Sequence, residues 1–165
     1  MDIGILAKYG NRQTEESLGI KQLVIQVEIK EDSESTEELS TGNESILIVD
    51  DDIDVAETLS EMLISLEYKT TVIRSGFSAL KLFKLDSHHF DLIITDQIMP
   101  EMKGTELAKE LLAIRPDIPI VLCTGYSESV SPEQAKTIGI REFITKPVAL
   151  DDLSSKIRNA LDQQL

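Results

Sequence analysis

Short apolar runs alternate with amphipathic segments from residue 45 to residue 165. The apolar runs predict strands at Ile46–Val49, Thr70–Ile73, Leu92–Thr95, Ile118–Cys123 and Phe143–Thr145. The segment after the first run places these apolar residues on one helical face: Val55, Leu59, Met62, Leu63 and Leu66. The last segment repeats the pattern with Leu150, Leu153, Ile157 and Leu161. Short apolar strands separated by amphipathic helices predict a doubly wound α/β domain, with a five-stranded parallel sheet and five helices.

The sequence also predicts the residue at which the first helix begins. Asp54 and Glu57 have the spacing of a capping box, in which the first residue is the N-cap and the second is N3. We therefore expect Asp54 to cap this helix.

The chain before residue 45 lacks the alternating pattern. Leu23–Ile29 alternates well enough to be a strand, but residues 1–22 show no sustained period and are too few to bury a core. Glu28–Glu44 contains seven acidic residues against one Lys, which is typical of a solvated linker. We expect residues 1–44 to form a partly disordered N-terminal extension with an acidic linker, and residues 45–165 to form the domain.

The formal net charge of -14 limits the partners of the chain. Nucleic acids and anionic membranes carry phosphates, which this charge repels. Trp is absent and only 4% of residues are aromatic, so the sequence offers no platform for stacking bases. We expect no nucleic acid and no membrane partner, whereas divalent cations and basic protein surfaces fit the charge.

Cysteine content and hydropathy indicate the cellular compartment of the protein. The single cysteine, Cys123, lies in an apolar run, where a buried reduced thiol is expected, and it excludes an intramolecular disulfide. No apolar run reaches the ~18 residues of a membrane span, and the N-terminus lacks the regions of a signal peptide. These features predict a cytoplasmic protein.

Polar residues follow the predicted strands at one end. Asp50 and Asp51 end the first strand, Asp96 ends the third, Thr124 the fourth and Lys146 the fifth. Because functional groups of open α/β sheets gather beyond the carboxyl ends of the strands, we expect these side chains to meet.

The aspartates allow two interpretations. Adjacent carboxylates raise one another's pKa unless a cation offsets the repulsion, but an aspartate can also simply cap a helix. The convergence of acids, a hydroxyl and an amine favours a divalent metal, and oxygen ligands without His or Cys favour Mg²⁺. Such a site suits phosphoryl transfer, with one carboxylate as a possible nucleophile.

Four motifs at these positions carry a family resemblance. They are VDDD at Val49–Asp52, TDQIMPEMKG at Thr95–Gly104, CTGYSE at Cys123–Glu128 and TKP at Thr145–Pro147. In their order and at these strand ends, the sequence closely resembles the receiver domain of two-component response regulators over residues 45–165. The resemblance implies a flavodoxin-like receiver fold with strand order 2-1-3-4-5.

The resemblance also implies roles for the site residues. Asp96 would accept a phosphoryl group from a histidine kinase or a histidine phosphotransfer protein, in a reaction that needs Mg²⁺. The implied metal ligands are Asp51, Asp96 and the backbone carbonyl of Ile98, with Asp50 acting through water. Lys146 and Thr124 would bond phosphoryl oxygens, and Lys146–Pro147 would be a cis peptide.

The same resemblance implies which residues would switch conformation and how long the phosphorylated state would last. Thr124 and Phe143 would form the switch, with Phe143 in a position often held by Tyr, and the readout would be the fourth helix, fifth strand and fifth helix. Ile98 and Tyr126 occupy the positions that orient the hydrolytic water. Neither suits that task, so we expect slow self-dephosphorylation and no other enzymatic activity.

The sequence predicts simpler roles for four further residues, two within the motifs and two outside them. We expect Lys103, His88 and His89 to be solvated, and Asp52 to cap a helix or tune the site. CTGYSE is most similar to receivers fused to hybrid histidine kinases. Since no output domain follows the last predicted helix, we expect the output to be a downstream protein partner or a phosphotransfer domain.

Two alternatives remain open from the sequence. A haloacid-dehalogenase-like phosphatase would use Asp50 as nucleophile in a D-x-D motif, although Asp54 stands where that motif expects Thr or Val and no cap domain is present. A degenerate receiver would bind partners without phosphate.

Overall fold

The computed structural model describes residues 39–125 and 130–163, which belong to one compact unit. The strand predicted at Leu23–Ile29 and most of the predicted acidic linker lie outside these residues. In the described part of the chain, no helix is long and apolar enough to cross a membrane.

Strands and helices alternate along the described part of the chain. The strands are β1 (Ser45–Val49), β2 (Lys69–Ile73), β3 (Leu92–Asp96), β4 (Ile120–Thr124) and β5 (Glu142–Thr145). The helices are α1 (Ile53–Ser65), α2 (Gly76–Leu85), α3 (Gly104–Ile114), α4 (Pro132–Ile138) and α5 (Leu150–Asp162).

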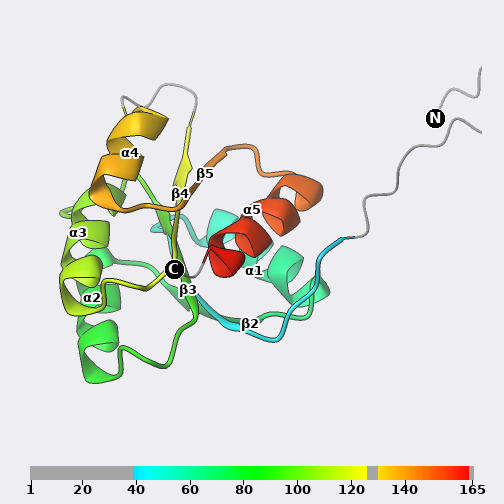
Figure 1. The fold of residues 1–165 in the computed structure, drawn as a ribbon, viewed down its shortest axis with the longest axis horizontal. Helices are drawn as coiled ribbons and strands as arrows, with labels where there is room; N and C mark the ends of the chain where they lie inside the picture. Colours follow the sequence, from blue (N-terminus) through cyan, green and yellow to red (C-terminus); the bar gives the residue numbers. More distant parts are fainter. Residues whose placement is uncertain (1–38, 126–129, 164–165) are drawn as a thin grey trace, which may run out of the picture. The chain divides into compact units, whose positions relative to one another are not determined.

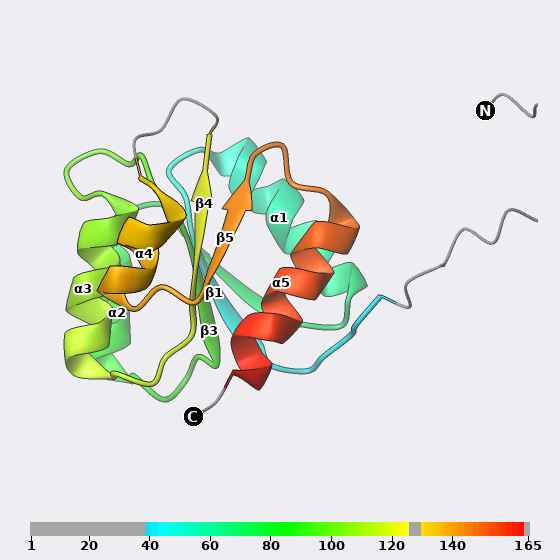
Figure 2. The same ribbon diagram turned by 45° about the horizontal axis from the view of Figure 1, so that its top comes forward.

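The sheet has the strand order β2-β1-β3-β4-β5, and all of its pairings are parallel. Helices α1 and α5 cover one face of the sheet, and α2, α3 and α4 cover the other (Figures 1 and 2). The doubly wound fold and the implied strand order are confirmed. The order reverses between β1 and β3, which is where sheets of this type form a crevice at their carboxyl ends.

Each face of the sheet buries its own apolar cluster. Ile46 and Ile48 of β1 pack with residues of α1 and α5, whereas Leu47 and Val49 pack with residues of α2 and α3. This alternation is the two-residue period of a strand with both faces covered. It explains why β1 and β3 read as continuous apolar runs.

The start of α1 differs from the sequence prediction. Asp52 is the N-cap, and its carboxylate accepts hydrogen bonds from the backbone N–H groups of Asp54, at 3.0 Å, and Val55, at 3.4 Å. Asp54 lies in the first turn of the helix, so its predicted role as N-cap was wrong. Asp52 takes this role because only three residues separate β1 from α1, and the helix has to begin directly after them.

The fourth strand also begins later than predicted. It starts at Ile120 rather than Ile118, because Pro119 has no N–H to donate to a ladder. Pro119 still accepts a hydrogen bond at its carbonyl from the Ile93 N–H, at 3.0 Å.

Residues 39–44 contact the domain, although the sequence placed them in the linker. Ser154 of α5 donates its hydroxyl to the carbonyl of Ser40 at 3.1 Å, and the Gly42 N–H donates to the carbonyl of Leu66 at 3.0 Å. Arg158 of α5 donates to the carboxylate of Glu44 at 3.0 Å. The contacts of the compact unit therefore begin before β1.

Candidate functional site

The predicted site residues meet at the carboxyl edge of the sheet. Asp50 follows β1, Asp96 and Thr124 end β3 and β4, and Lys146 follows β5. Asp50, Asp96 and Thr124 are 4%, 6% and 2% exposed, so two carboxyl groups are almost fully buried here. Buried carboxylates require a compensating charge or hydrogen bonds.

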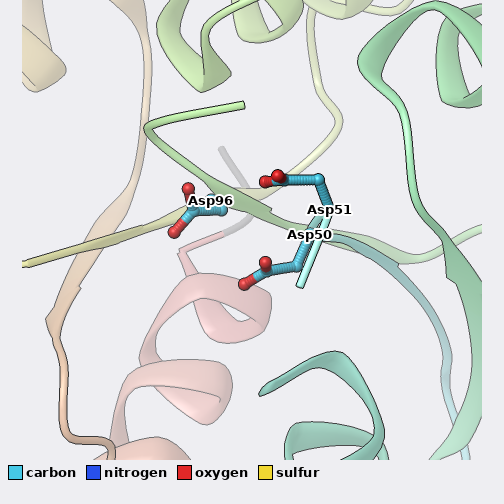
Figure 3. Close-up of side chains that lie close together, drawn as sticks. All are labelled: Asp50, Asp51 and Asp96. Carbon is cyan, nitrogen blue, oxygen red and sulfur yellow. The ribbon is translucent and has the colours of Figure 1, made fainter. Parts of the chain in front are cut away.

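Three carboxyl groups form an acidic cluster at this edge. One oxygen from each of Asp50, Asp51 and Asp96 lies within 4.8 Å of the other two. Asp50 and Asp51 extend from the β1–α1 loop to the same side, toward Asp96 on the neighbouring strand (Figure 3). Carboxylate oxygens at this spacing are suited to a hard divalent cation such as Mg²⁺. The residues present therefore fit the metal that the sequence predicts.

Lys146 bridges two of these acids. Its ammonium nitrogen lies 2.8 Å from Oδ2 of Asp50 and also donates to Oδ1 of Asp96. The backbone N–H of Lys146 donates to the carbonyl of Thr124 at 2.8 Å, which ties β5 to β4 beside the site. The peptide bond from Lys146 to Pro147 is cis, as expected.

Burial and ion pairing act on the pKa values of this pair. Burial raises the pKa of Asp96 and outweighs the opposing effects of the Lys146 hydrogen bond and charge, while the charge of Asp50 adds to the rise. Burial alone would lower the pKa of Lys146, but the hydrogen bonds and charges of Asp50 and Asp96 raise it instead. Lys146 is therefore a permanent cation, and Asp96 is a carboxylate that a further cation would stabilise.

Backbone N–H groups orient two of the carboxylates. The Ile98 N–H donates to Oδ2 of Asp96 at 2.7 Å, and the Asp52 N–H donates to Oδ1 of Asp50 at 3.0 Å. Each bond fixes a side chain through the loop that follows its own strand. The acidic cluster is thus held by local turns and not only by Lys146.

Other predicted residues lie at the edge of the site or away from it. Ile98 is 63% exposed, and Phe143 is half-buried on β5 against the cluster that contains α3 and α4 residues. Tyr126 lies outside the described residues. Lys103, His88 and His89 are exposed, which confirms their expected solvation, and Asp52 is exposed and caps α1.

Gln97 is a site residue that the sequence analysis missed. It is only 5% exposed, and its side chain hydrogen-bonds to the start of α3. A signal was available, because Gln97 is a polar residue directly between the predicted phosphoacceptor and the predicted carbonyl ligand. Its partner on α3, however, lies eight residues away along the chain.

A cavity of about 570 Å³ adjoins the acidic cluster. It is lined mostly by apolar residues of β1, α1 and the segment after β5, including Val55, Leu59 and Val148. Asp50, Asp96 and Lys146 also line it, so the cavity reaches the charged groups of the site.

Comparisons with known proteins bear on the family and the fold of the chain. The family described as Response regulator receiver domain matches residues 46–158. The transcriptional regulatory protein ZraR of Escherichia coli strain K12 is 34% identical over 123 residues, which cover 74% of this chain and 27% of ZraR. The two-component response regulator ORR24 of Oryza sativa subsp. indica is 32% identical over 108 residues, which cover 66% of this chain and 17% of ORR24.

Two solved structures match this chain over almost their whole length. A response regulator receiver domain protein from Clostridium thermocellum superposes with a TM-score of 0.69 at 27% identity, over 73% of this chain and 95% of that protein. A CheY-like receiver domain protein from Methanospirillum hungatei JF-1 gives a TM-score of 0.65 at 31% identity, over 74% and 97%.

The chain thus spans about a quarter or less of the length of these two curated relatives, 27% of ZraR and 17% of ORR24. Neither is named as a hybrid histidine kinase, so the expected similarity to that class stays a prediction.

Proposed function

The chain belongs to the response regulator receiver domain family, and from this premise we propose that it is a signalling phosphoacceptor. Asp96 takes a phosphoryl group from a phosphohistidine of a histidine kinase or a histidine phosphotransfer protein. The observation that supports this most directly is the cluster of Asp50, Asp51 and Asp96 with Lys146 bridging two of them.

In the proposed reaction, a carboxylate oxygen of Asp96 attacks phosphorus and the phosphorus–nitrogen bond to the imidazole breaks. The Ile98 N–H holds Oδ2 of Asp96, which leaves the orientation of the carboxyl group fixed before the attack. A Mg²⁺ ion held by Asp51, Asp96 and the Ile98 carbonyl, with Asp50 acting through water, would neutralise charge on the transferred group.

Lys146 and Thr124 stabilise the phosphorylated state in this proposal. Lys146 already contacts Asp96, so a small movement brings its ammonium to a phosphoryl oxygen. The buried hydroxyl of Thr124 at the end of β4 bonds another oxygen. Movement of Thr124 toward the phosphoryl group frees space for Phe143 to turn inward, and the face formed by α4, β5 and α5 changes for a partner protein.

The protein acts as a module whose own catalysis is limited to phosphotransfer and slow self-dephosphorylation. The Ile98 side chain offers no hydrogen bond to a water behind phosphorus. The family resemblance assigns the second water-orienting position to Tyr126, and a tyrosine there is better suited to shielding than to orienting a water. We propose a cytoplasmic location, and an output through a downstream protein partner or a phosphotransfer domain. Neither nucleic acid nor membrane is a proposed direct partner.

The test is incubation with acetyl phosphate and Mg²⁺, followed by intact mass measurement and mapping of the modified residue. We expect modification of Asp96. The modification should be absent from Asp96→Asn and retained in Asp151→Asn, which changes an exposed residue on the first turn of α5. Modification of Asp50 instead would identify a haloacid-dehalogenase-like phosphatase. A protein that takes no label under these conditions would be a degenerate receiver.

A further inference from the structure

Gln97 is a buried polar residue whose main-chain and side-chain groups are all hydrogen-bonded. Its N–H donates to the carbonyl of Cys123 at 2.9 Å, and its carbonyl accepts from the Gly104 N–H at 3.1 Å. Its side-chain oxygen accepts from the Thr105 N–H at 3.2 Å. Its side-chain nitrogen makes a longer contact, 3.5 Å, with the hydroxyl of Thr105. Gln97 therefore joins the end of β4 to the start of α3.

The start of α3 depends on these bonds. The N-cap position is held by Lys103, whose exposed ammonium side chain cannot accept a hydrogen bond. The first N–H groups of the helix need acceptors from elsewhere. Gln97 supplies two of them, its carbonyl to Gly104 and its side-chain oxygen to Thr105.

The same bonds close the loop that carries the predicted carbonyl ligand. Residues 98–103 lie between Gln97 and α3, and Gln97 anchors both ends of this loop. On one side of Gln97 is Asp96, and on the other is Ile98, whose N–H holds the Asp96 carboxylate at 2.7 Å. A residue fixed at this point determines where both neighbours can lie.

We propose that Gln97 is a positioning residue for the cation site, which sets Mg²⁺ affinity by holding the Ile98 carbonyl and the Asp96 carboxylate in place. Gln97 is not itself a ligand, because its side-chain oxygen is occupied by Thr105. The inference rests on the proposed function, and it adds a determinant outside the acidic cluster.

The size of the effect follows from what such residues do in other metal sites. Residues that orient metal ligands typically change metal affinity by about 10- to 100-fold when they are replaced. Gln97 acts on one backbone carbonyl and one carboxylate rather than on the whole cluster, so we expect an effect of about 10-fold, at the lower end of that range.

The experiment uses Gln97→Met in the full chain, because methionine keeps the side-chain length and removes both polar groups. Mg²⁺ affinity is measured by titration with MgCl₂ in ¹⁵N-resolved NMR spectra, and phosphorylation by acetyl phosphate is followed over the same Mg²⁺ concentrations. The half-saturating Mg²⁺ concentration should rise about 10-fold in both measurements. The rate at saturating Mg²⁺ should return close to the wild-type rate.

Two further variants at the same position distinguish the effect of side-chain polarity from the effect of side-chain length. Gln97→Glu keeps the oxygen that accepts from Thr105 and should restore most of the Mg²⁺ affinity. Gln97→Asn keeps an amide but is one methylene shorter, so it should bind Mg²⁺ more weakly than wild type. This variant also keeps the proposal testable if the buried methionine prevents folding.

Gln134→Met is the matched control. Gln134 also accepts a backbone N–H through its side-chain oxygen at a helix start, from Ser131 at 3.1 Å, but on α4. Its loss should lower stability and leave the half-saturating Mg²⁺ concentration unchanged.

The outcomes distinguish the inference from the function on which it rests. A wild-type protein that neither binds Mg²⁺ nor takes label would overturn both. If the wild type binds Mg²⁺ and takes label, two results would overturn the role of Gln97 alone. One is a half-saturating Mg²⁺ concentration of Gln97→Met equal to that of wild type. The other is an increase in this concentration in Gln134→Met as large as that in Gln97→Met.

Discussion

Asp96 is subject to two opposing influences at the scale of a single residue. Burial disfavours its charged form, while the Lys146 ammonium and the Ile98 N–H favour it, and burial prevails so that the pKa is raised. The proposed nucleophile is therefore ionised in the folded protein at a cost in folding free energy. A cation bound at the site reduces that cost, because it offsets the negative charge of the carboxylate.

This balance predicts that Asp96→Asn is more stable than wild type at pH 7. A carboxyl group whose folded pKa is raised binds its proton more tightly when folded, so ionisation destabilises the fold. The penalty appears as pH rises from the unfolded pKa, ~3.9, through the higher folded value, and it is constant above. Thermal unfolding at several pH values should show the advantage of the variant at neutral pH and its disappearance in acid.

Asp151→Asn serves as the control for that measurement, because Asp151 is exposed on α5. An Asp96→Asn variant that is less stable than wild type at pH 7 would mean that ion pairing with Lys146 outweighs burial.

Ile98 leads to a prediction about the lifetime of the phosphorylated protein. Its side chain is 63% exposed beside Asp96 and has no group that could hold a water in line with phosphorus. Ile98→Asn supplies an amide at this position and should shorten the lifetime several-fold, since positioning is most of what a protein contributes to this hydrolysis. Loss of the label is followed by mass spectrometry after removal of acetyl phosphate. A fast wild-type decay, or one that this change leaves unaltered, would contradict the proposal.

At the scale of elements, the β3–α3 connection depends on close backbone approach. A Cβ atom on Gly104 would lie 2.2 Å from the carbonyl oxygen of Asp96 and 2.9 Å from Cδ1 of Leu122. The backbone carbonyl cannot yield as a flexible side chain can. The glycine is therefore required for α3 to begin directly against β3.

Gly104→Ala should lower the free energy of unfolding by about 1–3 kcal/mol, the usual cost of forcing an extra group into a packed site. Chemical unfolding measures the difference. Gly76→Ala is the matched control, because Gly76 also begins a helix but its nearest neighbours are atoms of the Met102 side chain at 3.1–3.2 Å. Equal losses in both variants would show that the contact with Asp96 is not the cause.

The segment 39–44 is a second element-scale feature, because it joins α5 to the end of α1. Its hydrogen bonds to Ser154, Leu66 and Arg158 predict that a protein beginning at Ser45 is less stable than one beginning at Leu39. Each of these three bonds contributes about 0.5–1.5 kcal/mol, so we expect a difference of about 1.5–4.5 kcal/mol in chemical unfolding. Amide exchange in α5 should also be faster in the shorter protein. Equal stability would mean that these contacts contribute nothing to the fold.

At the scale of the whole molecule, two apolar clusters lie on opposite faces of one sheet. The site lies at the carboxyl edge, where β3, β4 and β5 end beside one another. Lys146 is bonded to Thr124 through the backbone and to Asp96 through its side chain. A change at Asp96 therefore reaches the β4–β5 pair directly, and Phe143 lies on β5.

This connection predicts the distribution of changes when beryllium fluoride and Mg²⁺ are added as a phosphoryl mimic. NMR chemical shifts should change on α4, β5 and α5 as well as near Asp96, because the mimic draws Thr124 and Lys146 inward and biases a two-state equilibrium. Asp96→Asn should show none of these changes. Shifts confined to the β3–α3 loop would mean that no switch exists.

The sequence by itself determined the architecture and the location of the site. Apolar runs separated by amphipathic helices require a sheet covered on both faces, and in a parallel sheet the residues that end each strand share one edge. For that reason Asp50, Asp96, Thr124 and Lys146 could be brought together from their positions in the chain, and β1 and β3 could be read as buried strands.

The tertiary structure decided which neighbours each polar group has. Asp52 rather than Asp54 caps α1 because the β1–α1 connection is short, and residues 39–44 contact α5 because a helix more than 100 residues later lies beside them. Gln97 has a role only because α3 starts against it. Propensity and periodicity describe a residue and its neighbours in the chain, whereas these bonds depend on distances that exist only after the sheet and helices have packed.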